Sequence, residues 1–301
     1  MNAEPRAPSA EGRAPSERES AHRAQRSDAR RRFLRNRLAV VGLVIVAVLL
    51  LTALCAPLLA PYDPGLQNLP AKRTAPGTVF WLGADEFGRD ILSRIIYGSR
   101  VALLVGTVSV GIALALGLLS GIIAGFVGGF VDTLISRAIE ILLAFPYLLL
   151  AIAVVSALGP GVLNTTLAVG IWAMPAFTRI VRASVLSLRD MDYVQAARAM
   201  GTPTWAILAR HLLPNFLPTL IVYSTLYMAN AILVEAALSF LGLGVQPPTA
   251  SWGLMVATGR DFLLLAPHIA TIPGLAIMLA VLGFNLLGDG LRDALDPRLR
   301  T

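Results

Sequence analysis

Four charged residues fall close together near the first third of the chain. They are Asp85, Arg89, Asp90 and Arg94, and Asp90 and Arg94 are four residues apart, which is the spacing of an ion pair on a short helix. Such a helix can anchor a segment at a membrane interface or contact a partner protein, and the pattern alone favours neither. These four residues are therefore candidates for contacts with a binding protein or for a gate.

Known catalytic motifs are missing from the chain. A Walker loop needs a lysine after a glycine, and the only lysine, Lys72, follows Ala71. Neither a HExxH zinc helix nor a GxSxG nucleophile elbow occurs. His268 alone does not make a metal site, because metal ligands normally come in clusters. We expect no catalytic residue, no metal and no cofactor in this chain, and an enzyme within the membrane is poorly supported.

Three polar side chains near residue 227 share one face of an expected helix. Tyr223, Tyr227 and Asn230 stand at positions i, i+4 and i+7. They could line a wet path for a transported solute. Aromatic packing between helices is at least as good an explanation.

The segment 190–215 carries signals for two short helices with a bend. Asp192 can cap the first helix, Gln195 can reach back as its capping-box partner, and Gly201 can end it. Thr202 and Pro203 then favour a second helix start. By helix signals alone, the segment is a capped connection.

The second helix of this segment is expected to end at Leu213 and Pro214, where the chain turns into the next span. Ala196 and Ala197 leave the first helix slim on one side, and Met200 flanks that side. A slim face with flanking side chains suits insertion into a partner's groove.

The elements that must position these residues are membrane-spanning helices. The chain of 301 residues is 56% hydrophobic and only 14% charged, against roughly 25% charged in soluble domains. Gly159-Pro160-Gly161 divides one long apolar run into two helices. Residues 236–259 are rich in Gly and Pro and are expected to form an outer loop. The six expected spans lie near 38–60, 100–123, 140–158, 163–181, 216–234 and 269–287.

Basic residues indicate the orientation of these spans. Ten of the 25 lie in the first 37 positions, and 19 fall in segments that share one side of the membrane. The positive-inside rule therefore predicts both termini in the cytoplasm, and this distribution explains the net charge of +7 without nucleic acid. The charge-free runs also lack the ionisable groups that ion-coupled carriers commonly hold at bilayer depth, which disfavours coupling to an ion gradient.

The order of segments follows from these predictions. The first, 1–37, is an Arg-rich tail that is expected to be mostly disordered and able to touch anionic lipid. The span 38–60 follows, then an extracytoplasmic segment 61–99 with a short amphipathic helix. A core of spans, 100–287, contains the loop 190–215. The tail 288–301 ends the chain in the cytoplasm.

The loop resembles the signature loop of the permease subunits of ABC importers. The resemblance rests on Gln-Ala-Ala, then Gly201 after three residues, His211 after nine more, and Leu213-Pro214 after one. It implies that Gln195, Ala196, Ala197, Met200, Gly201, His211, Leu213 and Pro214 dock onto an ATP-binding subunit and transmit its closure. Gln195 stands where the family usually has Glu, so this position carries no charge.

Three other stretches are similar to the C-type permease of dipeptide, oligopeptide and nickel importers. They are residues 81–94 (WLGADEFGRDILSR), 237–244 (ALSFLGLG) and 288–298 (GDGLRDALDPR). The resemblance extends from about residue 38 to the end. It implies an all-α membrane protein with six spans and the type I ABC importer permease fold.

The same resemblance implies the assembly. The partners would be a homologous B-type permease, two ATP-binding subunits that hold ATP and magnesium, an extracytoplasmic solute-binding protein and membrane lipid, in a bacterial inner membrane. Peptides are the expected substrate, with nickel or another small solute as the alternative within the class. An ion-coupled secondary transporter and a membrane scaffold without a transport role are the rivals from other classes.

Overall fold

The computed structural model describes residues 31–295, and over that range it is built from helices with one isolated bridge between Ala84 and Asp90. The predicted N-terminal tail 1–37 therefore lies outside the described residues up to position 30. The predicted C-terminal tail 288–301 lies outside them from position 296. The helices are α2 (Arg37–Leu54), α3 (Ala56–Leu59), α4 (Ile91–Val127), α5 (Gly129–Ala144), α6 (Tyr147–Leu158), α7 (Val162–Arg189), α8 (Asp192–Ala199), α9 (Thr204–Ile207), α10 (Leu213–Phe240), α11 (Trp252–Gly259) and α12 (His268–Leu295), with short turns of 3-10 helix at Leu69–Ala71 and Arg260–Phe262 and of π-helix at Leu208–Leu212.

Five helical stretches within residues 31–295 are long and apolar enough to cross a membrane. They are α2, α4, α7, the continuous stretch Thr204–Phe240 and α12. The pair α5 and α6 passes the same test together but is bent by 95°, so it makes a sixth span only as a broken one. The span predicted near 140–158 contains a break, because Pro146 disfavours helical geometry at Phe145, which is extended.

The second span is longer than the sequence indicated. Asp90 caps α4, and the helix continues from Ile91 to Val127 without a break, so the short helix predicted within 61–99 is the first part of this span. Gly98 does not interrupt it. A Cβ at Gly98 would lie 2.6 Å from Trp252 Cδ1, so this glycine permits close packing against α11.

The expected outer loop at 236–259 is partly helical. Helix α10 continues to Phe240, and α11 follows after a turn-rich connection. Gly259 is the last residue of α11, and a Cβ there would lie 2.7 Å from the backbone nitrogen of Ala270. This glycine allows α11 to pack tightly against α12.

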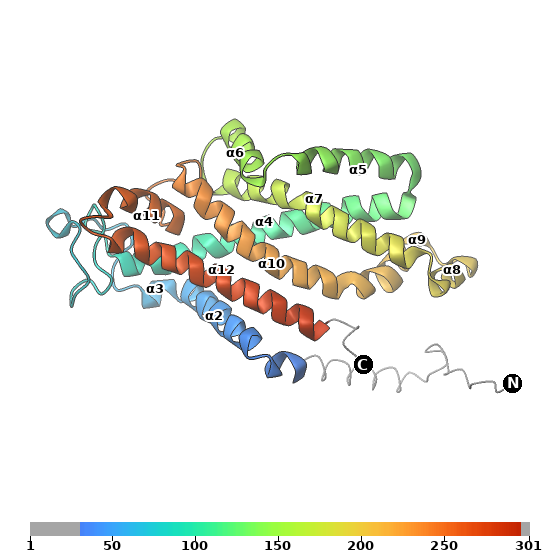
Figure 1. Ribbon diagram of the computed structural model, residues 1–301, viewed down its shortest axis with the longest axis horizontal. Coiled ribbons are helices and arrows are strands. Elements are labelled where there is room, and N and C mark those ends of the chain that lie inside the picture. Colours follow the sequence, from blue (N-terminus) through green and yellow to red (C-terminus); the bar gives the residue numbers. More distant parts are fainter. Residues whose placement is uncertain (1–30, 296–301) are drawn as a thin grey trace.

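Glycines also determine how the long helices pack. Along α4, Gly117, Gly121 and Gly125 approach α7, and a Cβ on any of them would lie within 3 Å of α7 atoms. Small residues at intervals of four let helix backbones come close together, as is common in membranes. The tight α4–α7 pair forms the centre of the bundle, and α10 and α12 run beside it (Figure 1).

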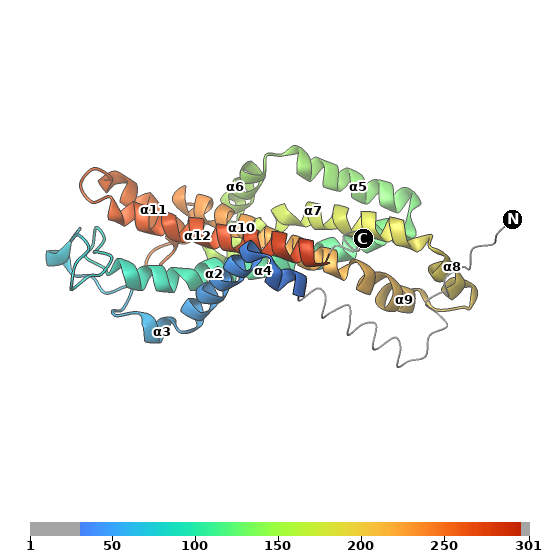
Figure 2. The ribbon, with the colours of Figure 1, turned by 60° about the horizontal axis from the view of Figure 1, so that its bottom comes forward.

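The two ends of the bundle differ in what they carry. The segment 61–90 and α11 lie at one end, and α8 and α9 lie at the other (Figure 1). The start of α2 and the end of α12 point toward the α8 end in both views (Figures 1 and 2). They are joined there, since Asn36 Nδ2 donates a hydrogen bond to Asp293 Oδ2 at 3.3 Å.

Candidate functional site

Helix α8 begins differently from the capping box that the sequence predicts. Met191 is the N-cap and Asp192 is already the first helical residue, where its carboxylate faces the positive end of the helix dipole. The Gln195 side chain does reach back, but it donates to the Asp190 carbonyl oxygen at 3.1 Å. Gln195 therefore fastens the turn before α8, and the predicted pair of reciprocal caps does not form.

Gly201 ends α8 as predicted. Its φ is +75°, the left-handed conformation that glycine adopts without steric cost. The Gly201 amide donates to the Arg198 carbonyl at 2.9 Å, and the Thr202 amide donates to the Ala197 carbonyl at 3.0 Å. These two bonds are the Schellman pattern, so the bend after α8 has a defined geometry.

The second half of the loop joins α10 without a break. Pro203, and not Thr202, is the N-cap of α9. The predicted end at Leu213 and Pro214 is wrong, because the turn of π-helix over Leu208–Leu212 carries the chain directly into α10. Pro214 lies in the first turn of α10, where a proline's missing N–H costs little.

Several contacts fasten α8 to the spans. Asn215 Nδ2 donates to the His211 carbonyl at 2.6 Å and lies 3.4 Å from the Tyr193 hydroxyl. The Arg198 guanidinium lies 4.8 Å from the centre of the Phe126 ring, at the end of α4. The loop is therefore connected to both α10 and α4, and a displacement of α8 would act on two spans.

The predicted coupling residues do not all face outward. Gln195, Ala196, Met200, Gly201 and Pro214 are exposed, and Met200 is 78% exposed. Ala197 lies on the buried face of α8, while His211 and Leu213 are half-buried. Trp205, which the sequence reasoning passed over, is 66% exposed on α9. The sequence signal for including Trp205 was its position in a loop outside the predicted spans.

The charged cluster at the other end is buried. Arg89 Nε lies 2.6 Å from Asp85 Oδ2, and Arg94 Nε lies 3.5 Å from the same oxygen. Asp90 instead caps α4 by accepting from the Ser93 amide at 2.8 Å, so the predicted pair of Asp90 with Arg94 does not form. Arg94 is 2% exposed, and the other three are also buried. These side chains hold the segment 61–90 on the start of α4, where Arg94 Nη1 donates to the Pro64 carbonyl at 3.0 Å. A contact with a binding protein or a role in a gate stays a prediction.

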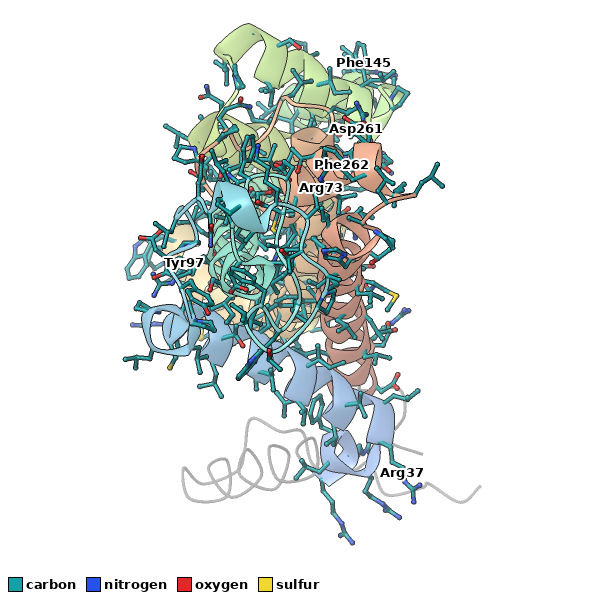
Figure 3. All side chains as sticks on the ribbon, turned by 90° about the vertical axis from the view of Figure 1, so that its left-hand side faces the viewer. Arg37, Arg73, Tyr97, Phe145, Asp261 and Phe262 are labelled. Atoms are coloured by element: carbon teal, nitrogen blue, oxygen red, sulfur yellow. The ribbon has the colours of Figure 1, made fainter. Side chains whose placement is uncertain are left out.

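This segment also contacts the connection between α11 and α12. The Arg73 guanidinium lies 5.4 Å from the centre of the Phe262 ring, at the end of the bundle that faces the viewer in Figure 3. A Cβ on Gly83 would lie 2.6 Å from His268 Cδ2, the first residue of α12. The segment therefore covers this end of α4, α11 and α12 as one cap.

The three predicted path residues lie on α10 with different surroundings. Tyr227 packs against α7, with its ring centre 5.0 Å from that of Phe177 and 6.0 Å from that of Trp172. Tyr223 and Asn230 are exposed. Both explanations offered by the sequence thus have support: Tyr227 packs between helices, and its neighbours on the same face remain open.

Ionisable groups do occur within the helices, although the charge-free runs lack them. The helices extend beyond those runs and include Arg179 and Arg182 in α7 and Glu235 in α10. Glu235 is buried and only 2% exposed. Its Oε1 accepts from the hydroxyls of Ser239 and Ser251, each at 2.8 Å.

The chain is a bundle of apolar helices of membrane-spanning length with a short two-helix loop at one end, as expected for a membrane permease subunit. Comparison with known families specifies it further. Residues 117–301 match the family described as "Binding-protein-dependent transport system inner membrane component", and residues 25–76 match the "N-terminal TM domain of oligopeptide transport permease C". The chain belongs to this family of ABC importer permeases.

Individual relatives cover nearly the whole chain. The dipeptide transport system permease protein DppC of Alkalihalophilus pseudofirmus is 44% identical over 274 residues, which is 91% of this chain and 90% of the relative. The di/tripeptide transport system permease protein DppC of Pseudomonas aeruginosa is 45% identical, over 89% of this chain and 90% of the relative. The glutathione transport system permease protein GsiD of Pectobacterium atrosepticum is 43% identical, over 90% of each chain.

Solved structures support the same fold. A chain of the inward-facing methionine ABC transporter MetNI superposes with a TM-score of 0.56 at 18% identity, covering 68% of this chain and 98% of that chain. At this identity the likeness concerns the fold alone. It confirms the all-α permease fold that the sequence predicted.

Proposed function

We propose that this chain forms half of the translocation path of an ATP-driven importer for di- and oligopeptides. Membership of the permease family supports the transport role, and the named relatives support peptides as the substrate. A glutathione permease among the relatives is consistent with this class, since glutathione is itself a small peptide. Nickel or another small solute remains the alternative within the class.

The loop 190–215 is the observation that carries the proposal. It presents an exposed surface of Gln195, Ala196, Met200 and Trp205 at one end of the bundle. We infer that an ATP-binding subunit receives this surface, and that ATP and magnesium are held there and not in this chain. Because α8 is fastened to α4 and α10, closure of the ATPase would move these spans together.

The rest of the assembly follows from the same role. We propose a homologous B-type permease as the other half of the path, two ATP-binding subunits at the α8 end, and an extracytoplasmic solute-binding protein at the end formed by the segment 61–90 and α11. Both chain termini would then be cytoplasmic in a bacterial inner membrane. The positive-inside rule supports this orientation, as does the direction of α2 and α12 toward the α8 end.

Co-purification and reconstitution test the proposal together. Purification in mild detergent should recover the second permease and both ATP-binding subunits, and the assembly should take up Ala-Ala into proteoliposomes only with ATP. Isolation of the chain as a lone active carrier would contradict the proposal. So would uptake that persists without ATP and collapses with the proton gradient.

The variant Gly201→Trp tests the coupling loop itself. Gly201 has the left-handed backbone, which a tryptophan would strain. The space around Gly201 is open in this chain, so the bulky side chain would project toward the docked partner. We expect ATP hydrolysis to continue while uptake falls. Gly274→Ala is the matched control, because Gly274 also has open space but lies in α12. If Gly201→Trp left uptake intact, the chain would be a scaffold without this coupling.

A further inference from the structure

A polar groove lies between α5 and α7, at the expected cytoplasmic ends of the spans 140–158 and 163–181. It has a volume of about 90 Å³ and is lined by Ser136, Glu140, Thr178, Arg179 and Arg182, together with apolar side chains. That volume corresponds to roughly three water molecules. The groove can therefore receive one end of a small molecule and not the whole of a peptide.

The three charged side chains of the groove differ in how well an opposite charge neutralises them. Arg182 is fully engaged, since its Nη2 donates to Asp132 Oδ2 at 2.7 Å and its Nε bonds the other carboxylate oxygen. Arg179 is exposed, and no carboxylate between residues 31 and 295 lies within ion-pair distance of it. Glu140 contacts Arg137 at 2.7 Å, but that pair is largely exposed and therefore weak.

Aromatic side chains adjoin Arg179. Trp172 precedes it by two turns on α7 and contacts both Tyr147 of α6 and Tyr227 of α10, with ring centres 5.6 and 6.0 Å apart. Residues seven apart lie on the same face of a helix, so Trp172 and Arg179 share one face of α7. Through Trp172, this face of α7 adjoins Tyr227 on the predicted path face of α10.

We propose that this groove is a binding station for a zwitterionic peptide end, with Arg179 receiving the carboxylate of the transported peptide. A guanidinium binds a carboxylate through two parallel hydrogen bonds, and such charge-assisted bonds are stronger away from bulk water. Glu140, at the same groove, disfavours a bare anion and favours a ligand that also carries an ammonium group. The inference rests on the proposed function. It adds that the translocation path itself prefers ligands that carry both a carboxylate and an ammonium group.

Substitution of the two charges tests the station in the complete transporter. The assembly with its solute-binding protein is reconstituted in proteoliposomes, with Ala-Ala as the probe. Arg179→Gln and Glu140→Gln should each lower the maximal uptake rate about tenfold, the factor expected for one charge-assisted hydrogen bond. Arg179→Lys should retain most of the uptake. ATP hydrolysis stimulated by the binding protein should change less than about twofold, because the coupling loop is untouched.

Arg35→Gln is the control for loss of one positive charge. Arg35 is exposed before the start of α2, away from the groove, from the coupling loop and from the end assigned to the solute-binding protein, so its replacement should leave uptake unchanged. Uptake by Arg179→Gln at the wild-type rate, or an equal loss with Arg35→Gln, would overturn the inference. A parallel loss of ATP hydrolysis in Arg179→Gln would also overturn it, since the residue would then act on the fold or on coupling.

The anionic phosphate of a lipid headgroup could bind Arg179 in place of a peptide carboxylate, and the vesicle composition separates the two sources. The uptake defect of Arg179→Gln should be equal in vesicles of phosphatidylcholine alone and in vesicles that also contain phosphatidylglycerol. A defect that depends on this composition would assign Arg179 to lipid and overturn the proposal.

Chemical labelling provides a second readout that does not depend on the uptake rate. In a Cys55→Ala background, the variant Ser136→Cys places a thiol in the groove and keeps Arg179. This thiol should react with a water-soluble thiol reagent, and Ala-Ala should slow the reaction during ATP turnover. No reaction, or no effect of Ala-Ala, would overturn the station. If instead the wild-type assembly showed no ATP-dependent uptake of Ala-Ala, the proposed function would fail first, and the inference with it.

Discussion

Glu235 of α10 accepts a hydrogen bond from the hydroxyl of Ser251, the residue that precedes α11, at a distance of 2.8 Å. The next residue, Trp252, donates its indole Nε1 hydrogen to the Ile95 carbonyl of α4 at 3.0 Å. The start of α11 is therefore held between two spans, one on each side. A buried carboxyl oxygen that accepts hydrogen bonds from two hydroxyls forms strong bonds, because little water competes for it.

Replacing Glu235 should loosen α11. Glu235→Ala leaves the hydroxyls of Ser239 and Ser251 without their acceptor, and an unsatisfied buried donor costs about 1 to 3 kcal/mol. Glu235→Gln keeps an oxygen that can accept, so the loss of stability should be smaller. Thermal unfolding in detergent measures both. Thr225→Ala is the control, because the Thr225 hydroxyl bonds only to its own helix on an exposed face. Equal stability of the Ala and Gln variants would contradict this role.

Close packing of α4 on α7 gives the next prediction. A Cβ on Gly121 would lie 2.7 Å from both the Thr178 carbonyl oxygen and the Val181 Cβ, and backbone atoms cannot move aside cheaply. We expect Gly121→Ala to destabilise the permease by about 1 to 3 kcal/mol, as overpacked cores do.

Gly111 provides a matched control on the same helix. No heavy atom lies within 4 Å of the position that its Cβ would occupy, so Gly111→Ala should be neutral or slightly stabilising through helix propensity. Thermal unfolding of the two variants in parallel distinguishes them. Equal midpoints would mean that the two helices pack less tightly than these contacts require.

The sequence predicted the class of fold because apolar length and breakers are local signals. Gly159 and Gly161 end and start helices where expected, and Gly201 ends α8 through a local backbone pattern. Tertiary packing overrode the same signals elsewhere. Gly98 and Gly259 occupy helices because neighbouring elements press against them, which only the folded chain reveals.

Side-chain partners were harder to predict than helices. The spacing of Asp90 and Arg94 suits an ion pair, but Asp90 caps the helix and Arg94 faces Asp85, because the segment 61–90 folds back on the start of α4. Glu235 is buried through contact with Ser251, 16 residues away. The sequence does not single out Arg179, because the charge-free run ends at Thr178, one residue before it. Such pairings depend on folding geometry that spacing within one helix does not contain.

The cap formed by the segment 61–90 should respond to pH through Glu86. Burial raises the pKa of the Glu86 carboxyl above its ordinary value of 4.5, and its Oε2 atom is buried without a hydrogen-bond partner among the described residues. The folded cap then binds the proton more tightly than the unfolded chain does. Stability contributed by this group is therefore present at low pH and is lost as the pH rises through the raised pKa.

Glu86→Gln tests this pH dependence by removing the titrating group. The variant should show a smaller fall in unfolding temperature between about pH 5 and neutral pH than the wild type. Asp261→Asn, a change at an exposed carboxylate of the same end, should keep the wild-type slope. An unchanged slope in Glu86→Gln would show that other groups control the stability of the cap.

Trp205 is the largest exposed apolar side chain of the loop that we assign to ATPase docking. Aromatic residues contribute strongly to interfaces when they become buried, and losing one commonly costs 2 kcal/mol or more of binding energy. We expect Trp205→Ala to weaken retention of the ATP-binding subunits by roughly thirtyfold in a detergent pull-down, the factor that corresponds to about 2 kcal/mol. Leu264→Ala is the control, since Leu264 is fully exposed at the opposite end of the bundle. Equal retention by both variants would exclude Trp205 from the interface, whereas a loss confined to Trp205→Ala would extend the docking surface from α8 onto α9.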